Sequence, residues 1–226
     1  MNCLWCDIDI IPQTNWETFL LPKRIKYICD QCEDRLEKIN SPRCIYCSRT
    51  SNESICSDCK WWKAYLKEDS LSFNYSIYSY NDYMRELMTR WKYRGDYILV
   101  KMFQHTFVET FKNIFSNQLK KSIIVPIPLS EDRLRERCFN QAEALAQMLP
   151  LTYECLLIRT HDEKQAKKSR RERLLTHNPF KAKRKINKSV ILVDDIYTTG
   201  TTIRHASNVL KENGCPNVYA YTLIRG

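Results

Sequence analysis

The stretch Val190–Thr202 holds the residues best suited to chemistry. Four apolar residues, typical of a buried strand, lead directly into two adjacent carboxylates. A loop of small hydroxyl residues around one glycine follows, and the apolar spacing behind it predicts a helix. Free loop N–H groups and the helix dipole attract phosphate, whereas carboxylates accept hydrogen bonds from sugar hydroxyls or hold a divalent cation. The stretch therefore predicts a phosphosugar site made of Asp194, Asp195, Thr198, Thr199, Gly200, Thr201 and Thr202.

Eight of the eleven cysteines form four Cys-x-x-Cys pairs within residues 1–62. Two such pairs supply the four thiolates of a tetrahedral zinc site, so four pairs predict two structural zinc ions. A redox dithiol usually shows only one such pair, near a βαβ unit. Pairing in sequence order is our preference, although an interleaved cross-brace fits the spacing equally well. The predicted ligands are Cys3, Cys6, Cys29, Cys32, Cys44, Cys47, Cys56 and Cys59.

The charge of this N-terminal segment bears on its role. It holds eight Lys or Arg residues and nine acidic ones, and eight metal-bound thiolates would add further negative charge. An acidic surface is poorly suited to following a phosphate backbone. We therefore expect the segment to dock onto the rest of the chain or onto a partner protein.

A second group of candidate residues is basic. Arg133 and Arg137 follow a short apolar strand, 123–128, and open α/β sheets bind ligands just past such strand ends. Guanidinium groups there suit pyrophosphate or DNA phosphates, and a solvated surface charge is the alternative for each. Residues 159–188 hold twelve Lys or Arg and three acids, which suggests a mobile basic flap or, alternatively, a solvated disordered loop. Its phosphate-binding candidates are Lys167, Lys168, Arg170, Arg171 and Arg173.

The order of predicted elements indicates an α/β fold. Strands are expected at 71–80, 123–128, 155–159, 190–193 and 217–224, with amphipathic helices at 84–91 and 97–119. We predict a metal-binding domain at 1–62 and an α/β domain at 70–226, with a junction at Trp61 and Trp62. If exposed, the aromatic rings of Phe139, Tyr197 and Trp62 would stack DNA bases; packing in a core is the alternative.

The 226 residues include no apolar run of 18 and no basic segment followed by an apolar N-terminal core. These observations predict a cytoplasmic protein without a membrane span or signal peptide.

Several motifs resemble known families. Val190–Thr202 is similar to the phosphoribosyl pyrophosphate (PRPP) signature of type I phosphoribosyltransferases. The block from Val125 through Arg137-Cys-Phe-Asn140-Gln141, with Trp91–Gly95 and Gln165…Arg173…Phe180, resembles the ComF family of competence proteins. The resemblance covers nearly the whole chain. It implies a mostly parallel phosphoribosyltransferase-like sheet with flanking helices, preceded by a double zinc ribbon.

The resemblance also implies ligands. The two aspartates would hold the ribose hydroxyls of PRPP and the loop 198–202 its 5′-phosphate, while the loop near Pro128 and Arg137 would face pyrophosphate and Mg²⁺. One residue departs from the family pattern, because Cys138 stands where the family usually has glycine. A positive φ at that position would strain a cysteine.

The process implied is DNA uptake in natural transformation. The protein would handle single-stranded DNA with a ComFA-like helicase or translocase and other competence proteins, which could recruit it to the inner face of the membrane. The first alternative is an active phosphoribosyltransferase acting on an unidentified base or nucleic acid, with catalytic residues unknown. The second is a regulatory protein that senses PRPP or a nucleotide.

Overall fold

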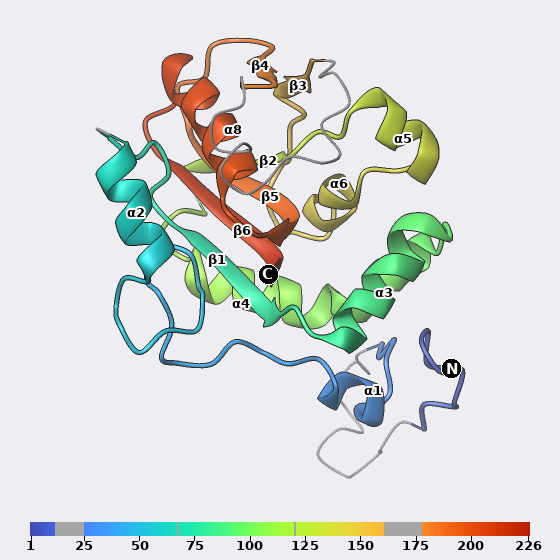
Figure 1. Ribbon diagram of the computed structural model, residues 1–226. Helices are drawn as coiled ribbons and strands as arrows, with labels where there is room; N and C mark the ends of the chain where they lie inside the picture. The colour runs from blue at the N-terminus through green and yellow to red at the C-terminus, as the bar shows by residue number, and fades with distance from the viewer. Residues whose placement is uncertain (12–24, 67, 120, 161–177) are drawn as a thin grey trace.

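Four parallel strands form the main sheet, in the order β1–β6–β5–β2 (Figure 1). The strands are β1 Asn74–Ser79, β2 Ser122–Pro126, β5 Ser189–Tyr197 and β6 Val218–Arg225. This computed structural model describes residues 1–11, 25–66, 68–119, 121–160 and 178–226. Because all four strands run the same way, the loops that follow them meet at one edge of the sheet.

The central strand β5 builds two cores. Ile191 and Val193 belong to the apolar core on one face of the sheet, whereas Val190 and Leu192 belong to the core on the other. All four side chains are buried. Neighbouring strand residues point to opposite faces, so this uninterrupted apolar run requires cover on both sides.

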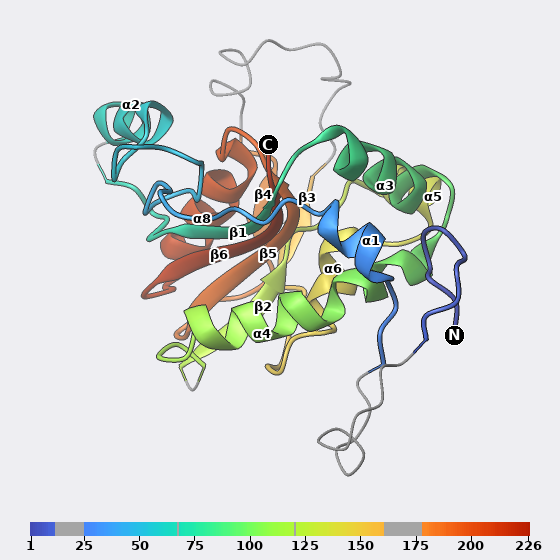
Figure 2. The ribbon, with the colours of Figure 1, turned by 90° about the horizontal axis from the view of Figure 1, so that it is seen from below.

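Helices cover both faces (Figures 1 and 2). The first core lies under α3 Asp82–Tyr93, the 3₁₀-helix η1 Tyr97–Phe103, α4 Gln104–Ile114 and α6 Gln141–Ala146. The second lies under α8 Thr201–Glu212 and an antiparallel pair, β3 Leu157–Arg159 with β4 Phe180–Ala182. The shorter helices are α1 Asp30–Asp34, α2 Ser57–Tyr65 and α5 Glu131–Arg137.

The N-terminal segment covers the free edge of β1. The N–H of Ile39 donates to the carbonyl oxygen of Ile77 at 2.8 Å, and the N–H of Ser79 donates to the backbone carbonyl oxygen of Glu37 at 2.9 Å. These bonds satisfy backbone groups that an edge strand would otherwise leave unpaired. The expected docking of this segment onto the rest of the chain is therefore observed.

The predicted α/β fold with a mostly parallel sheet is confirmed, and several predicted elements need correction. The residues predicted as one helix at 97–119 form η1 followed by α4, and the strand expected at 155–159 is only β3, outside the main sheet. Trp61 and Trp62 lie within α2 rather than in a linker, so the boundary proposed at residue 62 falls inside a helix. Among the described residues, no helix combines the length and apolarity that crossing a bilayer would require.

Candidate functional site

The eight predicted cysteine ligands gather into two sets of four. Cluster 1 comprises Cys3, Cys6, Cys29 and Cys32, and cluster 2 comprises Cys44, Cys47, Cys56 and Cys59. The thiols thus pair in sequence order rather than in a cross-brace, the alternative that spacing alone left open.

The sulfur positions fit zinc. Zn–S bonds of about 2.3 Å in a tetrahedron place neighbouring sulfurs about 3.8 Å apart. The Sγ atoms of Cys6 and Cys29 are 3.7 Å apart, and those of Cys47 and Cys56 are 3.6 Å apart. Four thiols leave no position for water or substrate, so both clusters suit a structural metal ion.

Cluster 1 packs against α3. Trp5 meets the Tyr83 ring edge-on with 5.4 Å between ring centres, and the Arg90 guanidinium lies 4.7 Å from the Trp5 ring centre. Burial and the neighbouring Cys32 thiol raise the pKa of the Tyr83 hydroxyl. Cys6 and Cys29 are only partly buried, so cluster 1 lies at the periphery of the first core.

Cluster 2 is fully buried and belongs to the second core, to which α8 also contributes. Arg225, at the end of β6, places Nη2 3.9 Å from the Cys47 sulfur and 3.8 Å from an oxygen of Asp58. The hydrogen bond between the Cys59 and Cys47 thiols, helped by the charge of Arg225, lowers the pKa of Cys47 and raises that of Cys59. A low thiol pKa favours the thiolate that metal binding requires.

The two predicted carboxylates lie inside β5, because the strand continues to Tyr197 instead of ending before Asp194. The N–H of Asp195 donates to a carboxylate oxygen of Asp194 at 2.9 Å. Burial, together with the adjacent charge of Asp195, raises the pKa of Asp194 to about 8. This carboxyl is therefore largely protonated near neutral pH in the free protein.

Sequence reasoning assigned no role to Lys92, which forms an ion pair with Asp195. Both side chains are 13 % exposed, so little water screens the pair. Its charge, like that of Arg159, opposes the increase in the pKa of Asp194. The only available signal was that Lys92 follows the apolar stripe of α3 and belongs to the Trp91–Gly95 motif.

The loop after β5 opens α8 as expected. Gly200 caps the helix with φ 81°, and a Cβ there would lie 2.1 Å from the Tyr197 hydroxyl oxygen. No side chain fits at this position, and the left-handed backbone favours glycine independently. The hydroxyl oxygens of Thr199 and Thr201 are 2.9 Å apart. The loop therefore presents small hydroxyls and helix N-terminal amides beside the carboxylate pair, as a phosphate site requires.

The two predicted arginines differ in burial. Arg133 is exposed on α5, whereas Arg137 is 8 % exposed and donates from Nη1 to Gln141 Oε1 at 2.9 Å. The Arg137 guanidinium lies 5.3 Å from the ring centre of Tyr93, the residue after Lys92. Cys138 caps α5 with φ 64°, so the strain expected for a cysteine at this position is present.

The basic segment lies mostly outside the described residues. This holds for all five of its phosphate-binding candidates, Lys167, Lys168, Arg170, Arg171 and Arg173. Its C-terminal part is not simply a loop, because β4 falls within it and Phe180 is 3 % exposed. Two of the suggested base-stacking rings are also buried, since Tyr197 is 2 % and Trp62 is 5 % exposed.

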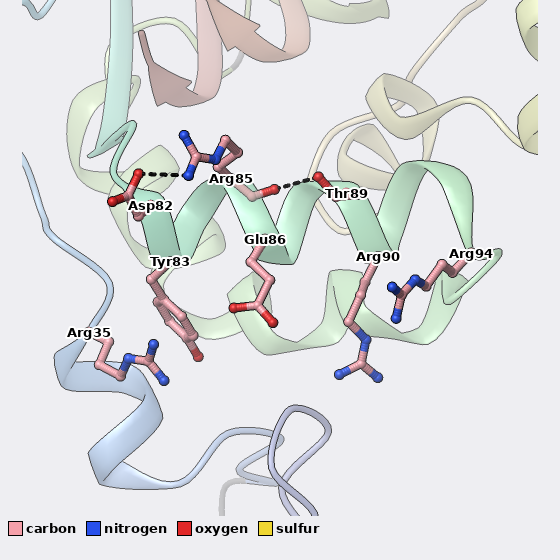
Figure 3. A pocket seen from close by; sticks show the side chains of 8 residues that line it. All are labelled: Arg35, Asp82, Tyr83, Arg85, Glu86, Thr89, Arg90 and Arg94. Atoms are coloured by element: carbon pink, nitrogen blue, oxygen red, sulfur yellow. Dashed lines mark hydrogen bonds and ion pairs between the residues drawn. The ribbon is translucent and has the colours of Figure 1, made fainter.

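A separate pocket of about 430 Å³ lies along α3 and extends to Arg35 of the N-terminal segment (Figure 3). Asp82 pairs with Arg85 inside it, and Arg90 pairs with Asp96 nearby. Because its arginines are partly neutralised, we assign it no ligand. Its lining residues are Arg35, Asp82, Tyr83, Arg85, Glu86, Thr89, Arg90 and Arg94.

Comparison with known proteins agrees with this geometry. The phosphoribosyl transferase domain model matches residues 110–226, which include the carboxylate pair and the loop. The chain is similar to competence protein ComFC of Bacillus subtilis (38 % identity, 99 % of this chain and 94 % of that protein). It is also similar to competence protein ComFC of Streptococcus pneumoniae (33 % identity, all of both chains). Competence protein F of Haemophilus influenzae matches about half of each chain at 29 % identity.

Similarity over nearly the full length, a parallel sheet whose central strand leads into a glycine-containing loop, and two four-cysteine clusters all agree. The chain belongs to the ComF family of competence proteins and carries a phosphoribosyl transferase domain in its C-terminal half.

Proposed function

We propose that the protein binds PRPP with Mg²⁺ at the loop 198–202 and handles single-stranded DNA during natural transformation. One observation carries the small-molecule part: a carboxylate pair at the end of the central strand directly precedes a glycine-containing loop at a helix N-terminus. Loop amides would hold the 5′-phosphate, and Asp194 and Asp195 would hold ribose hydroxyls. Arg137, with Arg133 more exposed, would face pyrophosphate.

Mg²⁺ prefers carboxylate and phosphate oxygens. The two aspartates and a pyrophosphate group would offer such oxygens, so this donor set fits the ion. Since a nearby cation favours the ionised carboxylate, binding should release the proton that Asp194 retains near neutral pH. Affinity for Mg²⁺-PRPP is then expected to rise between pH 6 and 8.

The DNA part of the proposal rests on the family and on charge. Residues 159–188 concentrate the basic residues of the chain, and Lys181, Lys183, Arg184 and Lys185 are exposed around β4. A positively charged segment is suited to a phosphate backbone, and the charge of Arg159, at its start, acts on the pKa of Asp194 in β5. A ComFA-like helicase or translocase would deliver or withdraw the strand, along with other competence proteins.

Two measurements test these parts separately. Calorimetry with Mg²⁺-PRPP should show binding that Asp195→Asn weakens at least about tenfold, because the variant removes a charged acceptor. Affinity for an oligothymidine should fall steeply with salt; a slope near zero between 50 and 200 mM would reject backbone binding.

The second candidate is an active phosphoribosyltransferase, which the family match and the aspartate beside the loop favour. Catalysis would be by positioning and charge stabilisation. Pyrophosphate release from PRPP should be measured with and without single-stranded DNA, on the wild type and on Asp194→Asn/Asp195→Asn. Release that the variant abolishes, accompanied by a phosphoribosylated acceptor rather than by free ribose 5-phosphate, would establish transfer. PRPP binding that changes DNA affinity without any release would support the sensor alternative.

A further inference from the structure

Trp62 connects the metal-binding segment to the phosphate loop. It lies on α2, three residues after the last cysteine of cluster 2, and is 5 % exposed. Its indole Nε1–H donates to the carbonyl oxygen of Thr199 at 2.9 Å, across 137 residues of sequence. A buried indole N–H needs an acceptor, and this one is a backbone carbonyl within the loop.

The bond fixes the direction of one peptide group. The Thr199 carbonyl and the Gly200 N–H belong to the same planar trans peptide, so they point in opposite directions. Holding the oxygen on the side of Trp62 turns the Gly200 N–H to the other side. If the peptide flipped, it would present a carbonyl oxygen instead of an N–H donor, and a carbonyl oxygen repels phosphate.

The Trp62 indole also packs against the guanidinium of Arg204. The Arg204 guanidinium lies 4.4 Å from the centre of the Trp62 ring and donates to the Tyr197 hydroxyl at 2.8 Å. It also pairs with Asp69 at 2.8 Å, and the Arg204 side chain is only 3 % exposed. Displacing Trp62 would therefore disturb a buried ion pair, which is costly.

We infer that Trp62 is a positioning residue that orients the Thr199–Gly200 peptide toward the 5′-phosphate of the ligand. The inference rests on the proposed phosphosugar binding at this loop. It assigns a function in the site to the cluster 2 helix, which lies outside the matched domain at 110–226. Trp62 would act through the backbone and need not touch the ligand.

The first test removes only the donor. Trp62→Phe keeps a ring but lacks the N–H. The matched control is Trp61→Phe, which keeps a ring at the 43 %-exposed position that stacks on Tyr65 and meets the Trp62 ring edge-on. We expect Trp62→Phe to weaken binding of PRPP and ribose 5-phosphate alike, by about three- to tenfold, with two zinc ions retained. The control should stay within about twofold. Wild-type affinity in a folded Trp62→Phe would overturn the inference.

The second test observes the loop directly. The chain has four glycines, and only Gly200 follows a threonine. Labelling with ¹⁵N-glycine and carbonyl-¹³C-threonine therefore identifies the Gly200 amide by its coupling. We expect Trp62→Phe to shift this resonance in the free protein and to reduce its response to ribose 5-phosphate, while Trp61→Phe changes neither.

The outcomes separate the two proposals. An unchanged Gly200 resonance in free Trp62→Phe would overturn the positioning role even if affinity fell. If neither PRPP nor ribose 5-phosphate shifts the Gly200 amide resonance of the wild-type protein, the proposed function is wrong. The part of the inference that concerns the ligand is then wrong as well. A shift confined to the free Trp62→Phe protein would then still support the hydrogen bond as the determinant of the peptide direction.

Discussion

The two cysteine clusters share a motif but lie on opposite faces of the sheet. A cysteine begins the helix in each, Cys29 for α1 and Cys56 for α2, and its N–H donates to the first sulfur of its cluster, at 3.3 and 3.4 Å. Cluster 1 belongs to the first core and is partly exposed, whereas cluster 2 is fully buried in the second core. The same motif therefore lies at the periphery of a core in cluster 1, whereas in cluster 2 it precedes the helix whose Trp62 contacts the candidate loop.

The largest expected effect is a difference in melting temperature between the Cys29→Ser and Cys56→Ser variants. Each should lower the zinc content from two ions per chain to one. Cys56→Ser should lower the melting temperature by about 10 °C more than Cys29→Ser does. The reason is that it leaves unpaired thiolates inside a core, whereas Cys29→Ser leaves them at the edge of one. Metal analysis and calorimetric melting measure both effects. Equal melting temperatures would remove the distinction between the clusters.

The next comparison uses the arginines that pack on the tryptophan next to each cluster, Arg204 on Trp62 and Arg90 on Trp5. Arg204→Met removes a buried guanidinium that pairs with Asp69 and donates to the Tyr197 hydroxyl. Because both groups lose this partner, the substitution should lower the free energy of unfolding by about 3 kcal/mol. Arg90→Met breaks a pair whose side chains are about one-third exposed and should cost under about 1 kcal/mol. Urea denaturation at constant zinc concentration measures both free energies of unfolding. A greater loss for Arg90→Met than for Arg204→Met would contradict the expected difference between the two pairs.

The raised pKa of Asp194 can be tested by measuring the free energy of unfolding as a function of pH. The pKa of Asp194 is about 8 in the folded chain and 3.8 as its unperturbed value, so the folded state binds the extra proton between these values. Stability of the free protein therefore falls as pH rises through this range, and Asp194→Asn removes that loss. The stability advantage of Asp194→Asn should grow by about 1 kcal/mol per pH unit from pH 6 to 8. A constant difference over this range would mean that the Asp194 pKa is not raised.

The smallest effect concerns Cys138, which belongs to neither cluster. Cys138→Gly should raise the unfolding free energy by about 0.5–1 kcal/mol, since glycine adopts φ 64° without strain. Cys155→Gly is the matched control at another exposed cysteine; its φ is not in the left-handed region, so it should be neutral or destabilising. Chemical denaturation of both variants would detect the opposite signs.

The sequence predicted best where chemistry and local pattern coincide. The strand–carboxylate–glycine loop and the four Cys-x-x-Cys pairs follow from short motifs, and the family resemblance implied the parallel sheet. It did not reveal contacts between distant segments, such as Lys92 with Asp195 and Trp62 with Thr199. Nothing local marks these residues, because a lysine at a helix end and a tryptophan on a helix are ordinary; only the packing of α2 and α3 brings them to the site.

Hydrogen–deuterium exchange of the wild-type protein with and without saturating Mg²⁺-PRPP tests the central claim most directly. If the loop binds the phosphosugar and cluster 2 supports it, exchange should slow in residues 198–204 and in α2, while α1 of cluster 1 stays unchanged. No protection anywhere would contradict PRPP binding. Equal protection of α1 and α2 would contradict the division of function between the two clusters.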